Sequence, residues 1–307
     1  MILNPHAGKG RAERAWPALE KRLRAAGVAF TQAVTCGPGD AIDLARQAAE
    51  AGATRLIVAG GDGTVNEVIN GCLLAAPDGQ RLPTLALLPL GTGTDFARGL
   101  GLGSLELALA ALLRGRPRPL DLGRVAYRDE GGQPRERAFI NVADFGLGPQ
   151  TSRHLARTPA RLGQAAYLYS ALRAIAAYRA VPLRVRVDDT LVYAGSSGVV
   201  AVANGRYFGG GMAVAPKARP DDGLFDVVIL GATDRRLLVG ELLPRTYRGT
   251  HLRHHAVHLA RGARVTIEAD TPLPLEVDGE IIGTTPAHFT LEPRRIGVLV
   301  ASEKTNR

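Results

Sequence analysis

Residues 60–67, Gly-Gly-Asp-Gly-Thr-Val-Asn-Glu, bring three glycines and a carboxylate into one short stretch. Glycines let the backbone approach a bulky anion and direct N–H groups at it. A carboxylate beside a phosphate is repelled unless a cation or a transferable proton lies between the two. The stretch therefore predicts a nucleotide phosphate site in which Asp62 has a metal-binding or an acid/base function.

The flanking sequence predicts that this stretch joins a strand to a helix. Leu56–Ala59 is an apolar run, and apolar residues then recur at helical spacing at Val65, Val68, Ile69 and Leu73. A strand, a glycine turn and a helix N-terminus together form a local geometry that binds anions.

Two other turns rich in small residues follow predicted strands. Residues 4–10, Asn-Pro-His-Ala-Gly-Lys-Gly, are not a P-loop, because the leading glycine is missing and Lys9 is followed by glycine rather than by Ser or Thr. Residues 90–98 follow the strand that ends at Leu88. Phosphate binding is one interpretation of this second turn, and capping of the next helix by Thr94 or Asp95 is the other.

The N-terminal part alternates short apolar runs with helical patterns. We expect strands at 1–3, 28–34, 56–59 and 85–88, and helices at 11–26, 40–51 with Asp40 as its cap, 64–75 and 104–113. Such alternation predicts a parallel sheet covered on both faces, with ligands at the carboxyl ends of the strands.

The composition changes after Asp121. Strand patterns occur at 139–143, 183–187, 199–203, 224–230, 264–268, 275–277 and 289–291, and one helix is expected at about 163–178. The predicted fold class is thus α/β + β: an α/β nucleotide-binding domain at 1–122, completed by 293–307 through a last strand at 296–301, and a β-sandwich domain at 123–292.

Charge and composition limit the partners. The net charge is +9, nearly all of it from arginine, while aromatic residues make up only 5% of the 307 residues. Nucleic-acid binding would favour basic runs interleaved with aromatics. Codon bias is one explanation of the charge, and attraction to an anionic membrane surface is the other.

The chain has no apolar stretch of membrane-spanning length and no N-terminal export pattern. Cys36 and Cys72 are far apart in sequence, and we expect both to be reduced. We therefore expect a cytoplasmic protein that contacts membranes peripherally. The oligomeric state is not readable, and a homodimer stays open.

Three weaker features have ordinary structural explanations. Residues 221–223, Asp-Asp-Gly, form a tight turn or hold a hard cation. Residues 278–280, Asp-Gly-Glu, predict a hairpin, and Glu280 gains importance only if it faces phosphate. The histidines at 251, 254, 255 and 258 have no recognised metal-ligand spacing, so we expect them on a solvated, arginine-rich surface.

Taken together, these motifs resemble the diacylglycerol kinase catalytic domain family, which includes soluble bacterial lipid kinases and sphingosine kinases. The resemblance spans nearly the whole chain, and the order of its motifs makes it specific. It rests on Asn4-Pro5 with Gly8, residues 60–67, 89–98, 141–148, 203–211, 216–225 and 278–280.

The resemblance implies ATP and Mg²⁺ as cofactors and assigns roles to residues. Glu280 matches the general base of the bacterial enzymes, and Asp62 matches an acid given that role or a Mg²⁺ role in the sphingosine kinase branch. Mg²⁺ would be held by Asp222 with the carbonyls of Arg219 and Leu224, and Asp121 would join through water. ATP would contact Asn4, Pro5, His6, Ala7, Gly8, Thr35, Gly61, Asp62, Gly63, Thr64, Val65, Asn66, Glu67 and Thr92.

Two positions depart from the family pattern. Thr94 stands where the family usually has Asn, and Ala7 stands where Ser is common. Each departure puts one hydrogen bond near the nucleotide in doubt, and neither removes a predicted catalytic acid.

The sequence therefore predicts an ATP- and Mg²⁺-dependent kinase that phosphorylates a lipid hydroxyl, on diacylglycerol or a related lipid. An NAD kinase shares the glycine turn and is the first alternative. A catalytically silent, nucleotide-regulated membrane-binding protein is the second.

Overall fold

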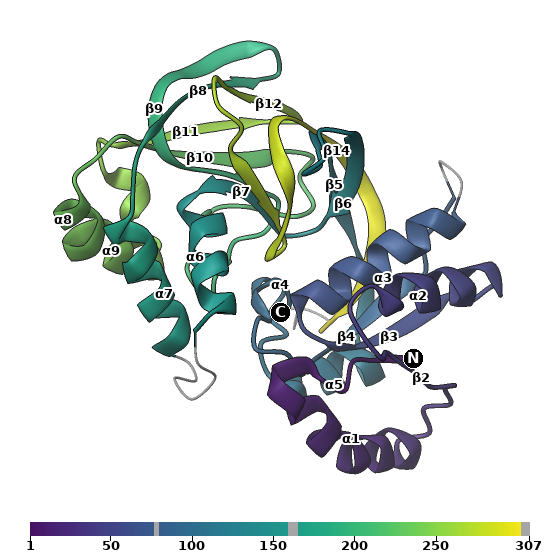
Figure 1. The fold of residues 1–307 in the computed structure, drawn as a ribbon. Coiled ribbons are helices and arrows are strands. Elements are labelled where there is room, and N and C mark those ends of the chain that lie inside the picture. Colours follow the sequence, from purple (N-terminus) through teal and green to yellow (C-terminus); the bar gives the residue numbers. More distant parts are fainter. Residues whose placement is uncertain (77–79, 159–164, 302–307) are drawn as a thin grey trace, which may run out of the picture. The chain divides into compact units, whose positions relative to one another are not determined.

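The computed structural model describes residues 1–76, 80–158 and 165–301. The chain divides into two compact units: Met1–Asp121 with Pro293–Arg307, here the α/β unit, and Leu122–Glu292, here the β-rich unit. The chain enters the β-rich unit within β5 (Arg116–Arg128) and leaves it within β14 (Glu280–Val300) (Figure 1).

The sheet of the α/β unit is parallel, in the order β14-β4-β3-β1-β2. Val298 of β14 pairs with Leu85, so the last strand of the chain joins this sheet. All these strands therefore end at the same edge. The bounds are β1 Ile2–Leu3, β2 Ala33–Val34, β3 Arg55–Gly60 and β4 Thr84–Pro89.

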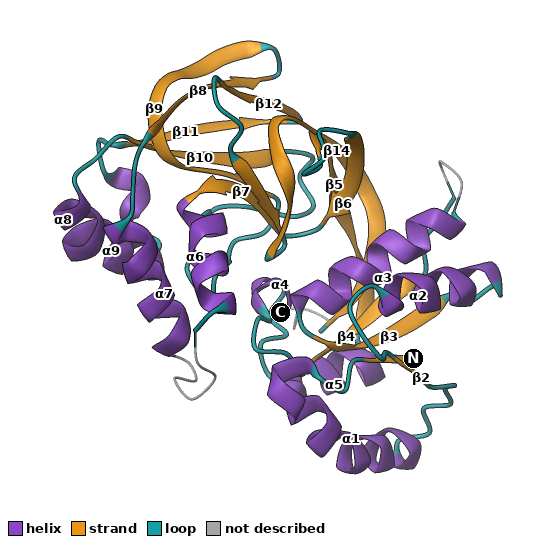
Figure 2. Cartoon of the chain, in the orientation of Figure 1, coloured by secondary structure: helices purple, strands orange, loops and turns teal. Residues whose placement is uncertain are grey.

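Helices cover both faces of this sheet, as the alternation predicts (Figure 2). The regular part of α1 buries Trp16, Leu19 and Leu23 in one core with residues of β3 and α5. On the other face α2 and α3 pack so closely that a Cβ on Gly71 would lie 2.1 Å from the Ile42 carbonyl oxygen. The bounds are α1 Ala7–Ala25, α2 Asp40–Glu50, α3 Asp62–Ala75, α4 Asp95–Gly99 and α5 Leu105–Arg114.

Two local predictions in this unit are wrong. The strand expected at 28–34 is reduced to Ala33–Val34, because Val28 and Phe30 pack against the α1 core instead of pairing with a strand. Asp40 does not cap α2: the cap residue is Gly39 at φ 87°, and the Asp40 carboxylate accepts the N–H groups of the preceding turn.

The β-rich unit is antiparallel, with the order β11-β10-β9-β7-β13-β14. The long strands β9 and β14 also pair with β8 and β12, which pair with each other. The predicted α/β + β fold class is confirmed. The bounds are β6 Pro134–Phe139, β7 Val142–Gly146, β8 Val181–Val187, β9 Thr190–Ala203, β10 Phe225–Gly231, β11 Val257–Gly262, β12 Arg264–Ala269 and β13 Pro274–Val277.

Phenylalanines fill the core of this unit. The rings of Phe139 and Phe225 are stacked with centroids 5.6 Å apart, and Phe289 meets Phe139 edge-on. Helices cover the other face of β9 and β10. Their bounds are α6 Leu147–Ala156, α7 Ala165–Ala176, α8 Arg235–Leu237, the π-helix η2 Leu238–Leu242, α9 Leu243–Tyr247 and the 3₁₀-helix η3 His251–Arg253.

The helix expected at 163–178 is present as α7, and residues 163–164 lie outside the described part of the chain. Strands β5 and β11 were not predicted, and the strand expected at 139–143 is divided between the end of β6 and the start of β7. Within the described residues, no helix is long and apolar enough to cross a membrane. Cys36 and Cys72 are unpaired, as expected, and burial raises the pKa of the Cys72 thiol to about 12.

Candidate active site

The carboxyl edge of the parallel sheet joins three loops into one surface. The Asn4 amide after β1 donates to the Thr64 hydroxyl after β3, at 3.0 Å. The N–H groups of Leu90 and Gly91, after β4, both donate to the Gly60 carbonyl oxygen. The three turns that the sequence singles out therefore form one continuous structure at the edge where ligands of parallel sheets bind.

Glycines allow these loops to approach one another. A Cβ on Gly91 would lie 2.4 Å from the Gly61 Cα, and a Cβ on Gly8, which has φ 62°, would lie 2.5 Å from the Leu90 carbonyl oxygen. Both distances are shorter than van der Waals contact, so larger residues would push the loops apart. The glycines are thus required for the shape of the edge, in addition to any contact with a ligand.

Asp62 is fixed by the loop that follows β4. Its two carboxylate oxygens accept the N–H groups of Asp95 at 2.8 Å and Phe96 at 3.2 Å. This corrects the capping interpretation of residues 90–98: Thr94 is the cap residue of α4 but makes no side-chain cap bond, and Asp95 pairs with Arg98. The carboxylate that caps α4 is therefore that of Asp62, after β3, and the local sequence around residues 90–98 does not reveal it.

Glu67 organises the start of α2. Its carboxylate accepts the N–H groups of Gly39 at 3.0 Å and Ala41 at 3.3 Å. The same segment begins with Thr35, which is 4% exposed and donates its N–H to the Leu3 carbonyl oxygen. These bonds connect the segment between β2 and α2 to α3 and β1 at the carboxyl edge of the sheet.

The other predicted nucleotide contacts differ in exposure. Val65 and Asn66 are 6% and 1% exposed and belong to the interior of α3, together with the largely buried Thr64. The accessible members lie on the three loops; they are Asn4, Pro5, His6, Ala7, Gly8, Gly61, Asp62, Gly63 and Thr92. The cap residue of α3, Gly61, makes no side-chain cap bond, and the Asp62 N–H donates to the Gly93 carbonyl oxygen at 3.1 Å. The positive end of the α3 dipole therefore lies at this edge.

In the β-rich unit, the hairpin at 278–280 is present as predicted, and its two carboxylates differ. Asp278, at φ 47°, accepts the N–H groups of Ile140, Asn141 and Val142 and is 9% exposed. Glu280 is 40% exposed at its side chain and pairs with Arg137 at 2.6 Å. Asp278 is thus a structural residue, and Glu280 is the carboxylate that a ligand can reach.

The predicted metal turn contains an ion pair. Asp222 accepts the Leu224 N–H at 3.3 Å and binds the Arg261 guanidinium at 2.6 Å. Carboxylate and carbonyl oxygens suit Mg²⁺, so the donors fit the ion, which would share Asp222 with Arg261. Among residues 1–76, 80–158 and 165–301, no group of three or more His, Cys, Asp or Glu side chains is arranged to hold a metal.

The side chains of the other two residues predicted near the metal, Arg219 and Asp121, have partners within the protein. Arg219 lies 3.7 Å from Asp221 in an ion pair of the same turn. Asp121 is fully buried in β5, and its carboxylate accepts the Arg294 N–H at 2.8 Å within the α/β unit. Asp121 therefore ties β5 to β14 where the chain passes between units.

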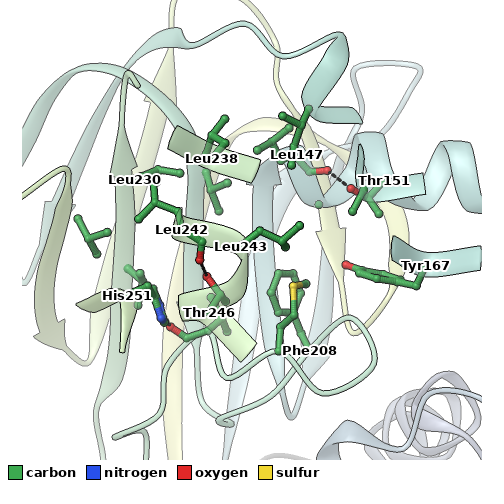
Figure 3. Close-up of a pocket in the computed structure, with 18 residues that line it drawn as sticks. Leu147, Thr151, Tyr167, Phe208, Leu230, Leu238, Leu242, Leu243, Thr246 and His251 are labelled. Carbon is green, nitrogen blue, oxygen red and sulfur yellow. Dashed lines mark hydrogen bonds between the residues drawn. The ribbon is translucent and has the colours of Figure 1, made fainter. Parts of the chain in front are cut away.

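An apolar pocket of about 110 Å³ lies under the helices of the β-rich unit, and the sequence analysis did not predict it (Figure 3). Both of its threonine hydroxyls are hydrogen-bonded: Thr151 donates to the Leu147 carbonyl oxygen at 2.7 Å, and Thr246 to that of Leu242 at 2.8 Å. The lining includes Leu147, Tyr167, Ala171, Ile175, Phe208, Met212, Leu230, Leu238, Leu242 and Leu243.

His251 also lines this pocket, which corrects the expected surface position of the histidines. His251 and His254 are 5% and 8% exposed, whereas His255 and His258 lie on the surface. Burial lowers the pKa of His251, whose Nε2 lies 3.0 Å from the Val214 carbonyl oxygen. The prediction was wrong because the pattern of residues 251–258 does not reveal the fold around them.

Two buried carboxyl groups lie beside the pocket. Asp144 of β7 and Glu276 of β13 are paired across the strands and are 1% and 6% exposed. A Cβ on Gly148, a lining residue, would lie 1.7 Å from the Asp144 Oδ2. Burial and the neighbouring Glu276 raise the pKa of Asp144 well above its usual value, and burial also raises the pKa of Glu276.

Comparisons with known proteins agree with this division of the chain. Residues 1–125 match the model of the diacylglycerol kinase catalytic domain, and residues 141–300 match that of the YegS C-terminal NAD kinase beta sandwich-like domain. The diacylglycerol kinase of Bacillus subtilis is 31% identical over 100% of this chain and 97% of its own length. The diacylglycerol kinase of Staphylococcus saprophyticus is 30% identical over 100% of this chain and 96% of its own length.

The fold is also that of a solved relative. A crystal structure of a diacylglycerol kinase from Bacillus anthracis superposes with a TM-score of 0.72 at 23% identity, over 97% of this chain and 95% of that one. The family models, the relatives and the motif order therefore agree along the full length of the chain. This chain belongs to the diacylglycerol kinase family and is a kinase of that family.

Proposed function

We propose that this protein transfers the γ-phosphate of ATP, with Mg²⁺, to a hydroxyl group of a lipid, with diacylglycerol or a related lipid as acceptor. The observation that carries the proposal is the apolar pocket of the β-rich unit. Its threonine hydroxyls are bonded to helix carbonyls, so its wall offers dispersion contacts and burial to an acyl chain. The dinucleotide NAD, with its charged phosphates, does not match such a wall.

The donor nucleotide is proposed to bind at the loop edge of the α/β unit. Backbone amides at the start of α3 and the accessible loop residues supply hydrogen-bond donors for phosphate oxygens. Asp62 is held by two amides, so its carboxylate is fixed before any substrate binds. Such preorganisation is the main protein contribution to phosphoryl transfer.

Glu280 is the favoured proton acceptor for the lipid hydroxyl. Its side chain is accessible, and Arg137 holds it at 2.6 Å. Asp62 is favoured as a positioning residue because both of its oxygens already accept backbone bonds. Mg²⁺, bound by Asp222 with the carbonyls of Arg219 and Leu224, would neutralise charge on the phosphates.

The experiment that tests this function is transfer of labelled γ-phosphate from ATP to lipids in mixed micelles, with NAD as a control acceptor. A labelled lipid product is expected. Label on NAD alone would reassign the protein to nucleotide phosphorylation. Bound ATP without transfer to any acceptor would favour a regulatory protein.

A further inference from the structure

The outer face of α7 carries large apolar side chains that are exposed to solvent. Leu168, Tyr169 and Leu172 are 45%, 44% and 39% exposed. Their spacing of three and four residues puts them on one side of the helix. The opposite side of the same helix buries Ala171 and Ile175 at the wall of the apolar pocket. Thus α7 is apolar on both sides, unlike an ordinary surface helix, whose outer side is polar.

A second segment repeats this arrangement. Val239 of η2 and Tyr247 of α9 are 40% and 41% exposed, whereas Leu238 and Leu242 of η2 are 3% and 4% exposed and line the pocket. The segment η2 packs against α7, and Figure 1 draws α6, α7, α8 and α9 as neighbours. We call the exposed set Leu168, Tyr169, Leu172, Val239 and Tyr247 the outer apolar face.

The charge around this face is strongly positive. Between residues 147 and 180 the sequence contains arginines and no acidic residue. Between residues 235 and 248 it contains four arginines and one acid, Glu241, which pairs with Arg245 at 2.8 Å. The exposed arginines of these two sequence segments are Arg153, Arg157, Arg173, Arg179, Arg235, Arg236 and Arg248.

We propose that the outer apolar face is the surface by which this protein docks on an anionic lipid bilayer. The proposal rests on the proposed function, because a lipid acceptor has to pass from the bilayer to the pocket. Exposed apolar side chains on segments rich in exposed arginine match a bilayer surface, because apolar side chains enter the interface and arginines meet anionic headgroups. Because the helices of the face also form the pocket wall, a bound bilayer lies next to the pocket that receives the acyl chain.

The test uses the full chain and sedimentation with phosphatidylcholine vesicles, with and without phosphatidylglycerol. The double variant Leu168→Ser/Leu172→Ser should bind anionic vesicles roughly tenfold more weakly than the unchanged protein. The double variant Arg157→Gln/Arg173→Gln should lose the preference for phosphatidylglycerol. The matched control is Leu74→Ser, which removes an apolar side chain that is 68% exposed on α3 of the other unit.

A second readout separates docking from catalysis. On a short-chain acceptor dissolved as a monomer, the Leu168→Ser/Leu172→Ser variant should keep the rate of the unchanged protein. Equal vesicle binding by this variant and by Leu74→Ser would overturn the docking surface. A variant that changes from a dimer to a monomer at unchanged vesicle binding would identify the face as a contact between copies and also overturn the proposal. If the Leu168→Ser/Leu172→Ser variant loses vesicle binding but the unchanged protein phosphorylates no lipid, the proposed function is refuted and the docking surface is supported.

Discussion

The loop edge of the α/β unit and the apolar pocket of the β-rich unit are built in opposite ways. At the edge, three loops are joined by backbone hydrogen bonds, and glycines bring their chains within contact distance. In the pocket, side chains from several helices and strands leave an apolar space, and its two threonine hydroxyls are hydrogen-bonded to helix carbonyls. The first suits a polar, charged ligand and the second an apolar chain, as expected for the donor and the acceptor of the proposed lipid kinase reaction.

The largest effect is expected at Glu280, the proposed proton acceptor. Glu280→Gln keeps the shape of the side chain and removes this acceptor, so kcat should fall by about 10² to 10⁴-fold. Steady-state kinetics with ATP and a lipid acceptor measure the change. Glu268→Gln, at an exposed carboxylate of β12, is the control. If Glu280→Gln kept the kcat of the control while Asp62→Asn did not, the base would be Asp62.

Substitution of a glycine at the loop edge should disrupt the contact between its loops. Gly91→Ala places a Cβ 2.4 Å from the Gly61 Cα, so the loops after β3 and β4 have to separate. We expect a loss of about 1–3 kcal/mol in the free energy of unfolding, as for overpacking, together with weaker ATP binding. Thermal unfolding and ATP titration measure these changes.

The control for that change is Gly240→Ala, where a Cβ meets nothing within 4 Å. ATP binding by Gly91→Ala equal to that of Gly240→Ala would show that the edge does not hold the nucleotide. The lipid pocket should be unaffected by either substitution.

The pocket can be filled without touching the edge. Ala171→Phe puts a ring into the space that an acyl chain would occupy, because Ala171 lines the pocket and is 7% exposed. The KM for a long-chain acceptor should rise on the order of tenfold, the effect of losing a few buried methylene contacts. The KM for ATP should not change.

The matched control is Ala176→Phe, on the exposed side of the same helix. An Ala171→Phe variant that folds normally and keeps the long-chain KM would remove the pocket from the acceptor site.

The smallest effect concerns the buried carboxyl pair beside the pocket. Burial and Glu276 raise the pKa of Asp144, so the folded protein keeps a proton that the unfolded chain releases. The stability contribution is complete below the unfolded pKa, near 4, and is lost as the pH rises through the folded pKa.

Asp144→Asn should therefore be more stable relative to the unchanged protein at pH 8 than at pH 5, as measured by urea unfolding. Asp270→Asn, at an exposed carboxylate, is the control. A constant difference between Asp144→Asn and the unchanged protein across this range would mean that the pKa of Asp144 is not raised in the folded protein.

The loop edge was largely predictable from sequence. Glycine turns after apolar runs indicated the strand ends, and the alternation of strands and helices placed all of these ends at one edge. Its side-chain partners were not predictable, because Asp62 caps a helix after β4 and Glu67 binds the start of α2, both across loops distant in sequence. Local sequence patterns predict the strands and helices. Tertiary contacts determine which carboxylate accepts the N–H groups at the start of each helix.

The pocket could not be predicted from sequence in the same way. Its lining comes from α6, α7, β9, β10, η2 and α9, and apolar residues in these segments are equally compatible with a filled core. The available signal was that apolar residues of α7 include Leu168 and Leu172, which lie at helical spacing on its exposed side. This signal indicates an exposed apolar face but not the pocket beneath the helix. His251 shows the same limit, because its burial depends on elements far from residues 251–258.

The most direct test of the division between donor edge and acceptor pocket is photolabelling with a lipid whose acyl chain carries a photoreactive group, followed by mapping of the labelled residues. If the pocket binds the acyl chain, we expect labels on α7 and the η2–α9 segment, on residues such as Ala171, Ile175 and Leu242. We also expect these labels to be lost in Ala171→Phe. Labels confined to the loops after β1, β3 and β4, or labels on α7 that persist in Ala171→Phe, would contradict acyl-chain binding in the pocket.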